Sequence, residues 1–89
     1  MTQITAAEAR RLAGPSVEDR VNEVFDLIRE RATAGYHVLN LKDDFWTREA
    51  YSQTEAYKAA VKQLTSAGFA VRFFYEEHQF VDMYTVVEW

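Results

Sequence analysis

The sequence predicts a two-layer α+β domain with the element order ααβαββ, in which a three-stranded mixed sheet with a C-terminal β-hairpin carries helices on one face. Three observations lead to this prediction: two apolar stripes with helical spacing, an apolar–polar alternation over the last twenty-one residues, and a glycine at the end of each helical pattern. A chain of 89 residues can build one compact core. We therefore expect a single domain over residues 1–89.

A short first helix is predicted over residues 6–13. Thr5 followed by Glu8 forms a capping box at its start, and Pro15 ends it by disfavouring the helical conformation of the preceding residue. Eight residues are too few for a helix that is stable alone. The segment 1–15 therefore docks on the domain, packs on a partner, or frays as a peripheral element.

A longer second helix begins after Ser16, which is a good N-cap, and ends at Ala34-Gly35. Its apolar residues fall on one stripe, namely Val17, Val21, Val24, Phe25, Ile28 and Ala32. Residues 36–41 (YHVLNL) then predict a strand, which is apolar on both faces and is therefore expected inside the sheet.

Residues 43–53 are ambiguous because several of them are able to cap a helical turn. The third long helix is expected at residues 55–67, where Gly68 ends it, with the buried stripe Tyr57, Ala60, Val61, Leu64 and Ala67.

The last two elements are strands at residues 69–75 and 80–89, joined by a polar turn. A helical crossover places the first two strands in parallel, as neighbours or one strand apart, and the hairpin adds an antiparallel strand.

Composition excludes several classes of protein. The chain has no cysteine, which excludes disulfide scaffolds, zinc fingers and thiol nucleophiles. A net charge of −4 argues against bulk nucleic-acid binding. No apolar run approaches ~18 residues, and the N-terminus lacks a signal-peptide pattern, so we expect a soluble protein without membrane contact.

The search for catalytic motifs finds no phosphate-binding loop, dinucleotide fingerprint, nucleophile elbow or zinc-protease motif. His37 has no motif that supplies a catalytic partner, so it is interpreted as structural. A polar turn holds the best metal candidates, although their spacing matches no known metal loop: Glu76, Glu77, His78 and Asp82. We therefore expect no catalytic residue, no metal and no cofactor, and keep a metal-dependent hydrolase as a third hypothesis.

Aromatic and basic residues gather between the strand at 36–41 and the helix at 55–67. Aromatic faces beside arginine can stack a base or hold a phosphate. The alternative function is therefore sequestration of a nucleotide-type anionic ligand in a pocket. The residues expected to line this pocket are Trp46, Arg48, Tyr51 and Arg72. The competing interpretation is that Phe45 and Trp46 cap the small core.

The sheet carries an unusual number of apolar residues on the face that should be exposed to water. Four of them occupy neighbouring cross-strand positions in the hairpin, namely Phe74, Phe80, Tyr84 and Val86. Monomeric proteins seldom expose an apolar patch of this kind to solvent. We therefore predict that the patch is an interface, with a two-fold homodimer as the favoured form. The alternatives are cover by the first helix and aromatic pairs that simply stabilise the hairpin.

From Val21 onward the chain resembles small uncharacterised proteins of tailed bacteriophages. The matching features are a helix ending at Ala34-Gly35, YHVLNL, QLTSAGF, AVRFFYEE and a closing strand VDMYTVVEW. The resemblance implies a phage accessory or virion-associated protein, located in the cytoplasm of the infected host or in the virion. We therefore expect a non-enzymatic protein that self-associates and binds a virion or host protein.

Overall fold

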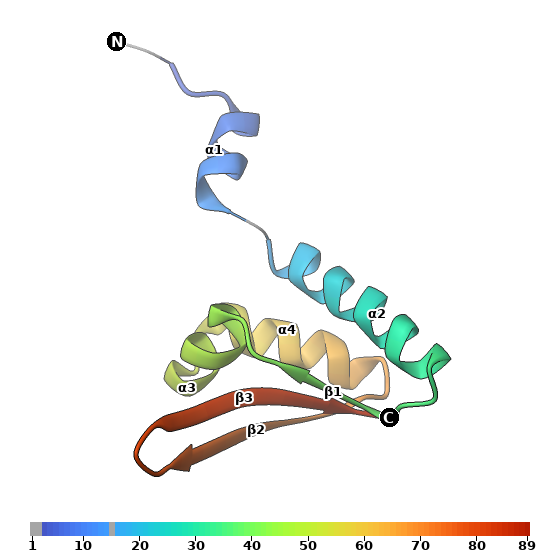
Figure 1. Cartoon of the computed structure of the whole chain (residues 1–89). Helices are drawn as coiled ribbons and strands as arrows, with labels where there is room; N and C mark the ends of the chain where they lie inside the picture. The colour runs from blue at the N-terminus through green and yellow to red at the C-terminus, as the bar shows by residue number, and fades with distance from the viewer. Residues whose placement is uncertain (1–2, 15) are drawn as a thin grey trace.

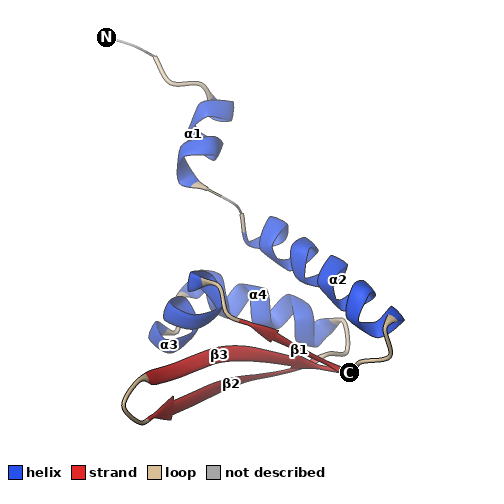
Figure 2. Ribbon diagram, in the orientation of Figure 1, coloured by secondary structure: helices blue, strands red, loops and turns tan. Residues whose placement is uncertain are grey.

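The computed structural model describes residues 3–14 and 16–89 and contains five helical segments and three strands within these ranges (Figure 1). In chain order they are α1 (Ala6–Ala13), α2 (Val17–Thr33), β1 (Val38–Leu41), η1 (Phe45–Glu49), α3 (Ala50–Ser52), α4 (Glu55–Ser66), β2 (Ala70–Glu77) and β3 (Val81–Glu88). Helices α2 and α4 lie together on one face of the sheet (Figure 2). The predicted two-layer α+β fold with a C-terminal hairpin is confirmed.

The sheet is fully antiparallel, not mixed. Its strand order is β1-β3-β2, and β3 is antiparallel to both neighbours. Strands β1 and β2 run parallel to each other but lie one strand apart, so no parallel pair forms. The placement of residues 36–41 inside the sheet was wrong, because the hairpin strand β3 inserts between β1 and β2 and leaves β1 at an edge.

The burial of β3 on both faces explains its central position. Thr85, Val86 and Val87 are each at most 2% exposed. Val87 packs in the core beneath the helices, while Val86 lies on the opposite face between its cross-strand partners Asn40 and Arg72. A strand with two covered faces is typical of the middle of a sheet.

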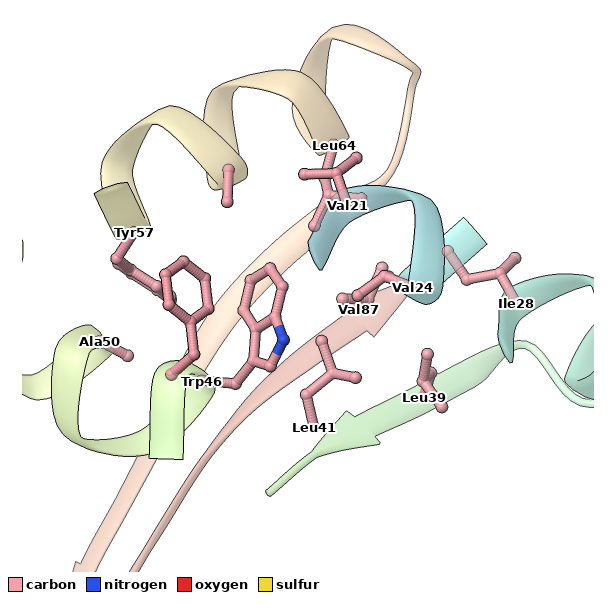
Figure 3. Close-up of a cluster of buried hydrophobic side chains, with 12 residues drawn as sticks. Val21, Val24, Ile28, Leu39, Leu41, Trp46, Ala50, Tyr57, Leu64 and Val87 are labelled. Atoms are coloured by element: carbon pink, nitrogen blue, oxygen red, sulfur yellow. The ribbon is translucent and has the colours of Figure 1, made fainter. Parts of the chain in front are cut away.

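Helix α2 begins and packs as its sequence predicts. The Ser16 hydroxyl accepts from the Asp19 amide at 3.1 Å, and the Asp19 carboxylate accepts from the Ser16 amide at 3.2 Å, which completes a capping box. Of its apolar stripe, Val21, Val24 and Ile28 are buried. They meet Leu64 of α4 and Leu39 of β1 in the core (Figure 3).

Helix α1 has the predicted bounds, and the Thr5 hydroxyl accepts from the Glu8 amide at 3.2 Å. It stands beyond the N-terminal end of α2, away from the sheet (Figure 1). Pro15, which was predicted to end this helix, lies outside the described residues. Within the described part of the chain, no helix is both long and apolar enough to cross a membrane.

The ambiguous segment 43–53 forms one π-helical turn, η1, followed by the short helix α3. This turn directs both Phe45 and Trp46 into the core, where each is 3% exposed. Their rings meet edge to face at 4.8 Å, and Tyr57 of α4 lies 6.0 Å from Trp46 (Figure 3). Such aromatic contacts add about 0.5–1.5 kcal/mol each beyond the area that they bury.

A buried hydroxyl ties this segment to the sheet. Thr85 Oγ1 donates to the Trp46 carbonyl at 2.6 Å and lies 3.3 Å from the Tyr57 hydroxyl. All three residues are at most 5% exposed, so water cannot replace these bonds. Thr85 therefore joins the sheet, the π-helical turn and α4.

We predict that Thr85→Val lowers the free energy of unfolding by about 1–3 kcal/mol, because it leaves the Trp46 carbonyl without its buried donor. Urea unfolding followed by tryptophan fluorescence measures this change. Thr33→Val is the control, since the Thr33 hydroxyl donates to the Arg29 carbonyl at an exposed position. It should change the free energy by less than about 0.5 kcal/mol, and equal losses in the two variants would contradict the assigned role of Thr85.

Candidate association surface

The side of the sheet turned away from α2 and α4 is called the outer face below. Val71 and Val87 pack toward the helices, so the even-numbered residues of β2 and β3 project to the other side. These residues are Ala70, Arg72, Phe74, Glu76, Asp82, Tyr84, Val86 and Glu88. The outer face is therefore an aromatic centre with charged residues toward both ends of the strands.

Phe74 and Tyr84 form the aromatic centre. They are cross-strand partners, and their rings stack at 4.8 Å between centroids with 23° between the planes. The Lys42 ammonium lies 5.0 Å above the Tyr84 ring, within range of a cation–π contact. Both rings are half-buried, which leaves part of each available to another molecule.

The four predicted interface residues do not form one patch. Val86 is 2% exposed within the single chain and has almost no surface to offer, so its assignment to an interface was wrong. Its cross-strand partner Arg72 is held over this part of the sheet by a bond from Arg72 Nε to Glu88 Oε1 at 2.6 Å. Phe80 is 81% exposed but lies in the hairpin turn, beyond the stacked pair.

The first helix does not cover the outer face. Figure 1 shows α1 beyond the N-terminal end of α2, on the side of the fold that carries the helices and away from the sheet. The stacked pair joins β2 to β3, as the alternative in which aromatic pairs stabilise the hairpin requires, and Lys42 lies over its Tyr84 ring. The outer face is thus stabilised by its own aromatic contact and still open.

A second aromatic pair lies on the helix-facing side of the hairpin. Tyr51 of α3 stacks on Tyr75 of β2 at 5.5 Å, and the two rings are 61% and 43% exposed. Desolvation, followed by the negative charge of Glu77, raises the pKa of the Tyr75 phenol, which donates to Glu77 Oε2 at 3.5 Å. At neutral pH the phenol therefore stays protonated.

The residues of the predicted anion pocket are not brought together. Trp46 is buried in the core, while Arg72 projects from the outer face and is bonded to Glu88. Arg48 and Tyr51 are exposed on the helical segment above the opposite side of the sheet. The competing interpretation, in which Phe45 and Trp46 fill the end of the core, matches their burial.

The metal candidates near the hairpin turn also lie on two different faces of the hairpin. Glu76 contacts His78, and Asp82 is the cross-strand partner of Glu76. Glu77 points to the other side, toward the Tyr75 hydroxyl. Over residues 3–14 and 16–89, no group of three or more His, Cys, Asp or Glu side chains is placed to hold a metal ion.

The side chain of His37, which was interpreted as structural, takes no part in the core. It precedes β1, its side chain is exposed, and its carbonyl accepts from the Trp89 amide at 3.1 Å. Its contribution to the fold is made by its backbone.

Sequence reasoning missed the Lys42 contact and the open edge of β2. Lys42 is four residues beyond the start of β1, and only the three-dimensional register brings it over Tyr84. Comparisons with family models, curated proteins and solved structures gave no match to this chain. Function is therefore inferred from the geometry of its surfaces.

We predict a coupling of roughly 0.5–1 kcal/mol between Phe74 and Tyr84 in a double-mutant cycle with Phe74→Leu and Tyr84→Leu. The stacked rings lose their mutual contact in either single variant, so the double variant should lose less stability than the sum of the singles. Urea unfolding at low protein concentration measures the three changes. Strict additivity would show that the rings do not interact in solution.

Proposed function

We propose that this chain is a non-enzymatic association module, which self-associates and binds a protein partner through the hairpin that carries the stacked pair Phe74 and Tyr84. The observation that supports this function is the half-buried stack of Phe74 and Tyr84 on the sheet face that α2 and α4 do not cover. Contact with a second molecule would remove the remaining exposed part of both rings from water.

The hairpin turn offers a second contact point for the partner. Phe80 and Val81 are 81% and 53% exposed, and they lie at the end of the hairpin farthest from the C-terminus (Figure 1). An exposed aromatic side chain at a turn can enter a pocket on another protein, as interface anchors commonly do. The resemblance to bacteriophage proteins makes a virion or host protein the proposed partner class.

The charge pattern favours protein over nucleic acid as the partner. Glu76 and Asp82 flank the aromatic pair toward the turn, and Arg72 at the other end is paired with Glu88. A surface that binds phosphate backbones requires several unpaired cations, whereas here Arg72 is paired and Lys42 lies over the Tyr84 ring. The net charge of −4 acts in the same direction.

We predict that light scattering after size-exclusion chromatography gives a mass that rises with concentration from 10.4 kDa toward twice that value. Phe74→Ser should shift this rise to higher concentration, since it removes an aromatic ring from the centre of the surface. Leu27→Ser is the matched control, because Leu27 is 41% exposed on α2 at the opposite side of the fold. A constant single-chain mass up to millimolar concentration would remove the proposal of self-association.

A further inference from the structure

We propose that two copies of this chain join through strand β2, edge to edge and antiparallel, to form one continuous six-stranded sheet. The inference rests on the proposed self-association and states which surface makes it. Strand β2 is the last strand of the order β1-β3-β2, so one of its edges has no strand beside it within the described chain. The open edge extends over Ala70–Glu77.

The backbone groups at this edge can be assigned from the pattern of hydrogen bonds. The His78 amide donates to the Phe80 carbonyl, which places the even-numbered residues of β2 and β3 in hydrogen-bonded pairs. Successive residues of a strand direct their N–H and C=O groups to opposite edges. The odd-numbered residues of β2 therefore direct theirs outward, namely Val71, Phe73, Tyr75 and Glu77.

The edge lacks several of the features that usually prevent pairing, although it carries charged side chains. Strand β2 has no proline and no lysine, and its eight residues pair with β3 without a bulge. Natural edge strands are commonly short or interrupted by such features. Strand β1 illustrates the contrast, because it has four residues.

The sequence of β2 is complementary to itself in one register. In an antiparallel pair, facing residues project to the same side of the sheet. A two-fold axis between two copies of one strand therefore lies midway between a residue and its own copy, and the register is named below by that residue. With the axis at Phe74, Arg72 faces Glu76 of the second copy and Glu76 faces Arg72 of the second copy. On the other side of the sheet, Phe73 faces Tyr75 of the second copy.

The neighbouring registers lack this complementarity. An axis at Phe73 places Arg72 opposite a phenylalanine, and an axis at Tyr75 places Phe74 opposite a glutamate. An axis at Arg72 or at Glu76 places like charges opposite each other, which destabilises a sheet. The axis at Phe74 is the one that matches opposite charges and aromatic rings at the same time.

Pairing in this register would extend the aromatic centre across the axis. Phe74 of each copy already stacks on Tyr84 at 4.8 Å, and directly opposed side chains of antiparallel strands have Cβ atoms ~4.5–5.5 Å apart. The rings would form a row of four across the joined outer faces. The four outward-facing residues of each strand would exchange about eight backbone hydrogen bonds, two in each of four pairs.

Charge exchange at two positions tests the register. Glu76→Arg should weaken self-association by about ten-fold or more, because it places like charges opposite each other twice in each dimer. Glu77→Arg is the matched control: it makes the same change in net charge one residue along, but its position faces Val71 of the second copy. It should leave the association constant within about two-fold.

Arg72→Glu should also weaken self-association, whereas an equimolar mixture of the Arg72→Glu and Glu76→Arg proteins should form mixed dimers with near-wild-type affinity. Sedimentation velocity on each protein and on the mixture measures this, and circular dichroism checks that each variant is folded, since Arg72→Glu loses the bond to Glu88. If Arg72→Glu does not fold, the comparison of Glu76→Arg with Glu77→Arg decides the register alone.

The outcomes separate the two proposals. Wild-type dimers that are unaffected by Glu76→Arg, or affected equally by Glu77→Arg, would overturn edge pairing at Phe74 and leave self-association standing. Wild-type protein that stays monomeric would overturn both.

Discussion

The burial of β3 on both of its faces is the constraint on which the rest of the structure depends. Thr85 and Val87 face the helices, and Val86 between them is covered on the outer side. Since only a central strand is flanked on both edges, β1 and β2 are placed on either side of it. The Thr85 hydroxyl then fixes the π-helical turn through the Trp46 carbonyl, and this turn supplies the buried aromatic side chains of Phe45 and Trp46 to the core.

Local patterns predicted most of the elements, because helices and hairpins are encoded by nearby residues. The stripe from Val21 to Ile28 and the cap at Ser16 were sufficient to place α2, and the alternation after Gly68 was sufficient to place the hairpin. The order of strands was not predictable in this way. The apolar residues on both faces of YHVLNL suggested a central strand, but Tyr36 packs against Arg31 at 4.3 Å and lies outside β1.

The candidate surface was predicted only in part, because local patterns place side chains on a face but do not show what covers them. Alternation correctly placed Phe74 and Tyr84 on one face, although the turn lies at residues 78–80 and not between predicted strands ending at 75 and beginning at 80. It could not show that Val86 is shielded by its neighbours on two strands, nor that Trp46 lies in the core. Burial depends on contacts between segments far apart in the chain, as the bond between Trp46 and Thr85, which are 39 positions apart, illustrates.

The short length of β1 has a consequence for the twist of the hairpin. Strand β1 pairs with β3 only from Val38↔Glu88 to Leu41↔Thr85. The half of the hairpin that contains Phe74, Phe80 and Tyr84 is therefore a two-stranded ribbon. Ribbons of two strands twist more strongly than wider sheets. This half is therefore expected to twist more strongly than the half that β1 widens, so the aromatic side chains near the turn are rotated about the strand axis relative to those above the core.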